Sequence, residues 1–400
     1  MKALRPVHPF PARMAPEIAV ARLRALPPYS TVLDPMAGSG TVLRHASEAG
    51  HRAIGFDTDP LAVLMAKVWT TPVDTGLVRS MARDVVERAR ETEAGGSSLA
   101  WQAGSETSAF VRYWFGEAQA AELKRLAYQL ELLDSFACAP PQADAVDCLR
   151  LALSRIIVTK DRGASLARDV SHSRPHKALA TSGFEVMPAF VKAISGLCSN
   201  LESAAPPGGV RVDLGDARRL DLLNASVDYL LTSPPYLNAI DYMRGHRLAL
   251  VWLGYSLGSL RRIRSDSIGA ERAPDCASVP DESLHVAIRQ MGEIERLPGR
   301  LQMMVFRYAG DLSMMLAEAK RVLRRGGKAT FVVGNSCLRG VFISNAECLK
   351  ALATSLGLTL ESEQERDLPV QSRYLPPPES GASALGRRMR TESVLEFSRT

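Results

Sequence analysis

The sequence predicts an α/β protein built on a doubly wound, mostly parallel sheet that carries a mainly helical insertion. Three observations predict this class. Two strand-and-helix units follow one another near the N-terminus, helical periodicity dominates the middle of the chain, and strand patterns return towards the C-terminus. Because parallel strands need crossover connections, alternating strands and helices indicate helices on both faces of one sheet.

The two N-terminal units share one plan. Each begins with a short apolar strand that ends in an aspartate, and a helical pattern follows. The strands are residues 30–33, ending at Asp34, and residues 52–56, ending at Asp57; the helices are residues 42–49 and a segment opened by Pro60. Proline favours the first turn of a helix, so Pro60 marks the start of the second one.

The middle of the chain has a different hydrophobic pattern. Between about residues 73 and 207 helical periods dominate, most clearly at residues 117–133, and no strong strand pattern appears before Val210–Leu214. This stretch is therefore expected to be an insertion or an added helical layer.

Strand patterns return in the last part of the chain. They lie at residues 227–231, at 329–333 after the turn signal Arg325-Gly326-Gly327, at 358–362 and at 393–397, with a helix at 346–355. The prolines at 376–378 and the segment 380–383 predict an irregular loop between the last two strands. The chain thus divides into residues 1–72, 73–207 and 208–400.

Composition excludes several classes. The 400 residues are 46% hydrophobic and 23% charged, values of an ordinary globular protein rather than of a disordered or collagen-like chain. No apolar segment is long enough for a membrane helix, and the N-terminus lacks the apolar core of a secretory signal. We therefore expect a cytoplasmic protein without a membrane partner.

Charge and cysteine spacing bear on partners and metals. The 49 Lys and Arg residues against 43 Asp and Glu residues give a net charge of +6, a mild excess compatible with a polyanionic partner. The six cysteines contain no Cys-x-x-Cys pair, which argues against a structural zinc site. They are interpreted as small buried hydrophobic residues.

The loop after the first strand suggests a nucleoside pocket. Asp34, Gly38 and Gly40 would let a ligand approach the backbone closely at the carboxyl edge of the sheet. Asp57 follows at about the twenty-residue spacing of a carboxylate that accepts ribose hydroxyls. A triphosphate is not expected, because no lysine follows Gly40. The alternative is an ordinary glycine turn between a strand and a helix.

A second group of residues lies in Thr232-Ser233-Pro234-Pro235-Tyr236, directly after the strand at 227–231. Consecutive prolines fix the backbone and donate no N–H, so the neighbouring carbonyls can accept hydrogen bonds from an amino group. Tyr236 could stack on a planar base, an interaction of about 1–3 kcal/mol. A diproline turn with a core tyrosine is the alternative, but the position after a strand favours a base-binding loop.

Taken together, DPMAGSGT at residues 34–41 and TSPPY at 232–236 resemble the two signature motifs of the S-adenosylmethionine-dependent amino-methyltransferases that modify DNA bases. HPFPARMAPEI at residues 8–18 resembles the family's segment over the methionine end of the cofactor, and GDARRL at 215–220 resembles its third-strand turn. The resemblance covers residues 4–72 and 210–333 well, and it implies a Rossmann-like methyltransferase sheet.

The resemblance also implies roles for single residues. The cofactor-binding set is Phe10, Asp34, Pro35, Gly38, Gly40, Thr41, Asp57 and Asp216, with Asp57 on the ribose and Asp216 near the adenine amine. The target base would be held by Ser233, Pro234, Pro235 and Tyr236. In this chemistry an exocyclic nitrogen attacks the sulfonium methyl group directly, no metal is needed, and the base is flipped out of the duplex.

The resemblance favours cytosine N4 as the methylated atom, because the Ser-Pro-Pro-Tyr form is usually associated with it and Asp-Pro-Pro-Tyr or Asn-Pro-Pro-Tyr with adenine N6. Adenine N6, RNA bases and a non-catalytic nucleic-acid-binding protein of the same fold are the alternatives. A restriction endonuclease is a possible partner of such an enzyme.

Basic residues suggest where nucleic acid would bind. The first group of candidates lies in the insertion and consists of Lys160, Arg162, Arg168 and Arg174. The second group follows Tyr236: Arg244 and Arg247 belong to a basic cluster that also includes His246, Arg261, Arg262 and Arg264. Target recognition is accordingly expected mainly in residues 73–207. A solvated loop is the alternative for the first group, and a flexible arm or a charged hairpin are the two interpretations of Arg387, Arg388 and Arg390.

Overall fold

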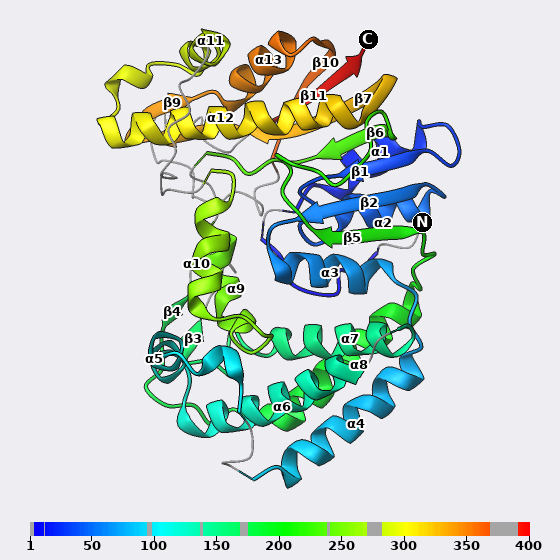
Figure 1. Ribbon diagram of the computed structural model, residues 1–400, viewed down its shortest axis with the longest axis vertical. Coiled ribbons are helices and arrows are strands. Elements are labelled where there is room, and N and C mark those ends of the chain that lie inside the picture. Colours follow the sequence, from blue (N-terminus) through cyan, green and yellow to red (C-terminus); the bar gives the residue numbers. More distant parts are fainter. Residues whose placement is uncertain are drawn as a thin grey trace.

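A seven-stranded sheet forms the centre of the upper part of the molecule in Figure 1. The computed structural model describes residues 4–11, 13–93, 98–136, 139–168, 175–237, 241–269, 282–368 and 391–400. The strands of the sheet, in spatial order, are β10 (Leu358–Asp367), β11 (Thr391–Arg399), β7 (Leu323–Gly334), β6 (Val227–Thr232), β1 (Thr31–Asp34), β2 (Arg52–Asp57) and β5 (Val210–Leu214). Only β11 runs antiparallel to its neighbours.

The strand order places a ligand site at one position. Counted along the chain, the first five strands of the sheet have the order 3-2-1-4-5 of doubly wound nucleotide-binding sheets. The order reverses between β1 and β6, which pair in parallel through Val32 with Tyr229 and Leu33 with Leu230. Ligands of such sheets bind beyond the carboxyl ends of the strands at this switch point.

Helices cover both faces of the sheet and form a separate helical layer. They are α1 (Pro16–Arg24), α2 (Thr41–Glu48), α3 (Pro60–Thr70), α4 (Thr75–Glu91), α5 (Ser105–Trp114), α6 (Glu117–Phe136), α7 (Gln142–Arg155), α8 (Val186–Ser203), α9 (Tyr242–Leu250), α10 (Leu257–Asp266), α11 (Glu282–Gln290), α12 (Gly299–Val322) and α13 (Asn345–Ser355), with 3-10 turns η1 (Ala100–Gln102) and η2 (Ile294–Arg296). Apolar residues of α11, α12 and α13 pack on one face, and those of α1 and α2 on the other.

The insertion is a helical lobe beyond the β5 edge of the sheet (Figure 1). Its helices α4, α6, α7 and α8 share one hydrophobic core with α3 and with α9. A short hairpin, β3 (Ala167–Arg168) with β4 (His176–Lys177), is the one strand pair among the described residues of this lobe. A second hairpin, β8 (Ser336–Leu338) with β9 (Val341–Ile343), follows β7.

The predicted fold class is confirmed: the protein has a mixed, mostly parallel α/β sheet with helices on both faces. The predicted strands and helices are present, and Pro60 opens α3, whose N-cap Asp59 accepts a hydrogen bond from the N–H of Leu61. One strand differs, because β7 begins at Leu323, before the predicted turn. A register shift against β6 accommodates this stretch, where Gly326 has a φ of 72°. The predicted loop at 376–378 and 380–383 lies outside the described residues.

Candidate functional site

Two loops that are far apart in the sequence meet at the switch point. Asp34 ends β1, Thr232 ends β6, and the Thr232 hydroxyl donates a 2.7 Å hydrogen bond to Oδ1 of Asp34 across a separation of 198 residues. Both side chains are buried. The loop after β1 (residues 35–40, the glycine loop) and the loop after β6 (residues 233–236, the diproline loop) therefore begin from two hydrogen-bonded residues at the carboxyl edge of the sheet.

The conformation of the glycine loop is set by the backbone angles of its glycines and by a hydrogen bond to Asp57. Gly38 and Gly40 have φ angles of 50° and 86°, in the left-handed region that favours glycine. Oδ2 of Asp57, at the end of β2, accepts a 2.8 Å hydrogen bond from the N–H of Gly38, and Oδ1 accepts one of 2.9 Å from the N–H of Asp59. The Asp57 carboxylate thus lies directly beside the loop.

Close packing explains why glycine occupies position 40. A Cβ there would lie 3.0 Å from Cα of Ala66 in α3, so α2 and α3 approach each other across this residue. Pro35 and Thr41 flank the loop, Pro35 buried after β1 and Thr41 as the first residue of α2. The structure thus places all the predicted residues of the motif at residues 34–41 in one connection between β1 and α2.

A buried carboxylate, Asp34, and a partly buried one, Asp57, lie at this edge and favour a positively charged ligand. Burial raises the pKa of Asp34 to about 7, although hydrogen bonds from Thr232 and from the N–H of Met36 oppose the shift. Burial and the neighbouring carboxylate of Asp59 raise the pKa of Asp57 to about 6. A cationic ligand would offset the cost of ionising both groups.

The N-terminal segment lies over the glycine loop. A Cβ built on Gly38 would lie 3.1 Å from Cε1 of Phe10, so the aromatic ring covers this position. Nε of Arg13 donates a 2.9 Å hydrogen bond to Oγ of Ser39, and its guanidinium also bonds the carbonyl of His8. His8, Phe10 and Arg13 therefore lie along one side of the glycine loop.

Asp216 lies at the same edge but in an ion-pair network. It follows β5, and the N–H of Gly215 donates to the carbonyl of Asp57 at 3.0 Å. The Arg218 guanidinium bonds both carboxylate oxygens of Asp216 and, at 2.6 Å, Oδ1 of Asp311 in α12. Sequence reasoning missed Arg218 and Asp311; the position of Arg218 within the same motif could have indicated the former.

The diproline loop is supported by β7. Ser233 donates its hydroxyl proton to the carbonyl of Val332 at 3.0 Å, which leaves the hydroxyl oxygen able to accept a hydrogen bond. A Cβ on Gly334 would lie 2.6 Å from Cε2 of Tyr236, so the tyrosine ring packs on bare backbone. The side chain of Tyr236 also hydrogen-bonds Glu392 in β11.

These contacts fix the loop. Pro234 is buried, and Pro235 and Tyr236 are partly buried. The carbonyl of Leu237, the next residue, accepts a 2.7 Å hydrogen bond from Ser336. The tyrosine ring is therefore oriented by its contact with Gly334 and by Glu392, a partner that sequence reasoning missed.

Helix α9 adds residues that the sequence did not single out for this site. Tyr242 stacks on Phe10 with ring centroids 5.1 Å apart and planes at 12°, and Nδ1 of His246 lies 2.5 Å from Oδ2 of Asp59. His246 was grouped with a basic cluster expected to contact nucleic acid. That interpretation is wrong for His246, because its side chain is buried against Asp59.

The predicted nucleic-acid contacts have several environments. Lys160, Arg162, Arg168 and Arg244 are exposed, whereas the guanidinium of Arg247 lies 5.3 Å from the ring centroid of Phe110. Arg174 and the group Arg387, Arg388 and Arg390 lie outside the described residues.

Other basic residues near the diproline loop and in the insertion are paired within the protein. Arg150 bonds Asp134, Arg261 bonds Glu106 and Arg264 bonds Asp241.

Two of the elements that carry exposed basic residues, β3 and α9, lie on the side of the molecule that carries the site (Figure 1). In Figure 1 the arrowheads of β2 and β5 point toward the side occupied by α9 and α10, and the β3–β4 hairpin lies beside the lower end of these helices. Arg168 belongs to β3 and Arg244 to α9. A ligand at the carboxyl edge of the sheet would therefore face these elements.

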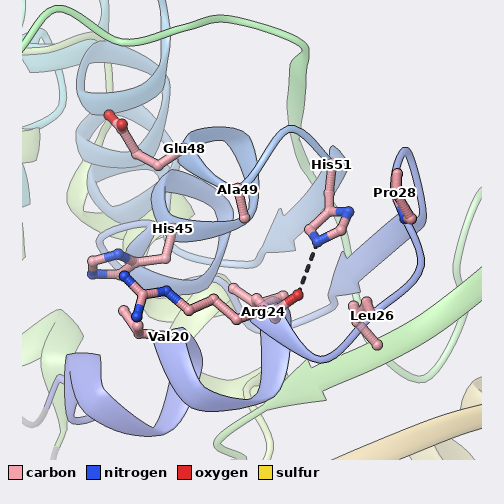
Figure 2. Close-up of a pocket in the computed structure, with 9 residues that line it drawn as sticks. Val20, Arg24, Leu26, Pro28, His45, Glu48, Ala49 and His51 are labelled. Carbon is pink, nitrogen blue, oxygen red and sulfur yellow. Dashed lines mark hydrogen bonds between the residues drawn. The ribbon is translucent and has the colours of Figure 1, made fainter. Parts of the chain in front are cut away.

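Figure 2 shows a pocket of about 310 Å³ at a different place. Its lining includes Leu23, Pro28, His45 and His51, from α1, α2 and the turns before β1 and β2. Nε2 of His51 lies 2.9 Å from the carbonyl of Leu23. Because β1 and β2 begin there and end at Asp34 and Asp57, this pocket is separate from the candidate site.

The described residues contain neither a candidate membrane span nor a candidate metal site. No helix within the described ranges is long and apolar enough to cross a membrane. Over the same part of the chain, no group of three or more His, Cys, Asp or Glu side chains is arranged to hold a metal ion.

Comparisons with known proteins find likeness at the level of structure. No protein-family model matches the chain, and no curated protein matches it. Similar solved structures include a TehB-like SAM-dependent methyltransferase from Corynebacterium glutamicum ATCC 13032, with a TM-score of 0.31, 11% identity and coverage of 96% of this chain and 88% of that one.

Two further structures differ in what their names say they act on. Geranyl diphosphate C-methyltransferase from Streptomyces coelicolor A3(2) has a TM-score of 0.34, 8% identity and coverage of 96% and 78%. A candidate DNA modification methylase from Thermus thermophilus has a TM-score of 0.23, 14% identity and coverage of 46% and 50%. At these values the likenesses carry no argument about activity, which depends on the site itself.

Proposed function

We propose that this protein is an S-adenosylmethionine-dependent DNA methyltransferase that modifies the exocyclic N4 of cytosine. The observation that carries the proposal is the hydrogen bond from Thr232 to Asp34, which joins the glycine loop and the diproline loop at the switch point of the sheet. A cofactor loop and an amine-binding loop are both needed for methyl transfer to a base, and here they share one edge.

The residues present fit the cofactor. Left-handed backbone at Gly38 and Gly40 allows close approach, and the carboxylates of Asp34 and Asp57, whose pKa values are raised, favour a cation. In the proposed assignment Phe10, Asp34 and the glycines would hold the methionine end. Asp57 would accept the ribose hydroxyls, and Asp216 would accept from the adenine amine.

S-adenosylmethionine would supply an activated methyl group. The protein's own task is to bind and orient the base amine. The hydroxyl oxygen of Ser233 and the carbonyls beside Pro234 and Pro235 would accept the amine protons, which orients the nitrogen lone pair. Tyr236, held by Gly334 and Glu392, would stack on the flipped base and offset part of the cost of unstacking it.

DNA would lie across the side that carries α9 and the β3–β4 hairpin. The exposed side chains of Lys160, Arg162, Arg168 and Arg244 support this placement, since cations on one side can follow a phosphate backbone. The helical lobe at residues 73–207 is the proposed site of target recognition, with residues 1–72 and 208–400 as the cofactor and catalytic halves. Arg174 and Arg247 remain in the proposed contact set.

Nucleoside analysis tests the proposal. Mixed-sequence duplex DNA is incubated with the protein and S-adenosylmethionine that carries a deuterated methyl group, digested and analysed by mass spectrometry, with the Tyr236→Ala variant as control. We expect labelled N4-methyldeoxycytidine with the wild type and at least 100-fold less with the variant. Labelled N6-methyldeoxyadenosine alone would reassign the target base to adenine. Label in RNA but not in DNA would contradict a DNA substrate, and no label in either would favour a non-catalytic binding protein.

A further inference from the structure

Helix α9 contacts both the helical lobe and the cofactor half (residues 1–72). On one side its apolar residues Met243, Leu248 and Leu250 belong to the hydrophobic core that the helical lobe shares with α3. The turn that follows is tied to the same lobe, because Nε1 of Trp101 donates a 2.9 Å hydrogen bond to the carbonyl of Val251.

Further contacts strengthen this attachment to the lobe. Arg150 of α7 donates to the carbonyl of Leu253 at 2.9 Å, and the rings of Phe115 and Trp252 meet edge to face with centroids 5.0 Å apart. The turn after α9 is therefore attached to the helical lobe by three side chains, Trp101, Phe115 and Arg150.

The opposite side of α9 contacts the cofactor half. His246 pairs with Asp59 at 2.5 Å, and both side chains are less than a tenth exposed. Asp59 caps α3 and donates its backbone N–H to Asp57, the residue proposed to hold the ribose. One turn earlier, Tyr242 stacks on Phe10, which covers Gly38.

We propose that α9 couples cofactor binding to nucleic-acid binding on the helical lobe, and that His246 is the positioning residue of this coupling. The inference rests on the proposed function. Binding at the loop of Asp57 would fix Asp59, and through His246 would fix the helix that carries Arg244 and Arg247. By linkage, nucleic acid would tighten cofactor binding by the same factor.

The ion pair gives the coupling a pH dependence. Burial lowers the pKa of His246, but the carboxylate of Asp59 outweighs it, and the net shift is upward. Asp57 also faces His246 from the loop after β2. His8, from the N-terminal segment, stays uncharged because burial lowers its pKa to about 3. The imidazolium that pairs with Asp59 is therefore present below the raised pKa of His246 and is lost as pH rises through that pKa.

Two variants and one control test the coupling. His246→Asn removes the imidazolium, and Asp59→Asn removes the carboxylate charge while asparagine still caps α3. His51→Asn is the matched control, since His51 is also buried and hydrogen-bonded, to Leu23 at the opposite edge of the sheet.

The measurement is the dissociation constant of S-adenosylhomocysteine, alone and with saturating DNA that the wild type methylates. We expect DNA to tighten binding at least about fivefold in the wild type and in His51→Asn, and less than twofold in His246→Asn and Asp59→Asn. The wild-type factor should fall as pH rises, and that of His246→Asn should stay flat. A wild-type factor retained in His246→Asn, or lost equally in His51→Asn, would overturn the coupling. A wild type that methylates no DNA would overturn the proposed function as well.

Discussion

At the scale of single residues, the site keeps a buried carboxylate that costs stability. Asp34 is 3% exposed, and its pKa is raised to about 7 by that burial. Its hydrogen-bond partners, the hydroxyl of Thr232 and the N–H of Met36, are neutral donors. The negative charge of ionised Asp34 is therefore only partly compensated unless a cationic ligand is bound.

The Asp34→Asn variant should unfold at a higher temperature than the wild type at pH 8. Asparagine can still accept both hydrogen bonds but carries no buried charge. Because Asp34 is protonated in the folded protein at pH 5 and ionised in the unfolded chain, the wild type loses relative stability as pH rises from about 4 to about 7. The advantage of the variant should accordingly be smaller at pH 5 than at pH 8. Thermal unfolding at the two pH values checks this, and a variant that is less stable than the wild type at pH 8 would contradict it.

The residue scale also shows what sequence could and could not predict. Asp34, Asp57 and the two glycines could be chosen because a strand end, a left-handed loop and a spacing are local patterns. The partners that orient the site could not, since Glu392 under Tyr236 and His246 on Asp59 come from distant segments. Such pairings depend on the tertiary fold and cannot be predicted from the periodicity of the sequence.

At the scale of elements, the β1–α2 connection depends on close approach between helices. Gly40 ends the loop as the N-cap of α2, with left-handed backbone, and faces Ala66 of α3. Gly50, after the same helix, has a similar φ of 82° but no atom within 4 Å of a Cβ placed there. A comparison of the two positions therefore separates the cost of left-handed backbone, which both share, from the cost of a steric clash, which only position 40 has.

Gly40→Ala should destabilise the protein more than Gly50→Ala. Left-handed backbone costs an alanine roughly 1–2 kcal/mol at either position. At position 40 the added methyl group also lies 3.0 Å from Ala66, so α2 or α3 must shift. Denaturant unfolding of the two variants gives the comparison; equal losses would mean that the helices are not closely packed at this point.

Prediction of elements was most accurate where patterns are local. The strands Val210–Leu214 and Arg52–Asp57 follow directly from short apolar runs, whereas β7 begins earlier than its turn signal suggested. Strand pairing with β6 extends β7 through the glycines by a register shift, an effect of the neighbouring strand. The role of α9 could not be read from its sequence, because its two faces contact different parts of the fold.

At the scale of the whole molecule, exposed cations occur both on the helical lobe and on α9 beside the sheet. Arg162 and Arg168 lie on the lobe, and Arg244 lies on α9. Exposed arginines also occur elsewhere, for example Arg83 and Arg88 on α4, which Figure 1 places at the far end of the lobe. Arg83 and Arg88 can therefore serve as a matched control for Arg162 and Arg168.

Replacing Arg162 and Arg168 with alanine should flatten the salt dependence of DNA binding. Each lost phosphate contact lowers the slope of log K against log salt by about 0.9, so the double variant should lose roughly 2. Arg83→Ala with Arg88→Ala removes the same charge from α4 and should leave the slope unchanged. Titrations at several salt concentrations measure both, and equal slopes in all three proteins would remove Arg162 and Arg168 from the interface.

In the proposed function the glycine loop binds the cofactor and the diproline loop binds the base. The S-adenosylmethionine dissociation constant and the single-turnover methylation rate, both measured in Tyr236→Ala and in Asp57→Ala, separate these two roles. For Tyr236→Ala we expect at least a 100-fold slower step with nearly unchanged cofactor affinity. For Asp57→Ala we expect at least tenfold weaker cofactor binding and, at saturating cofactor, a smaller loss of rate. Equal losses of affinity and rate in both folded variants would contradict these roles.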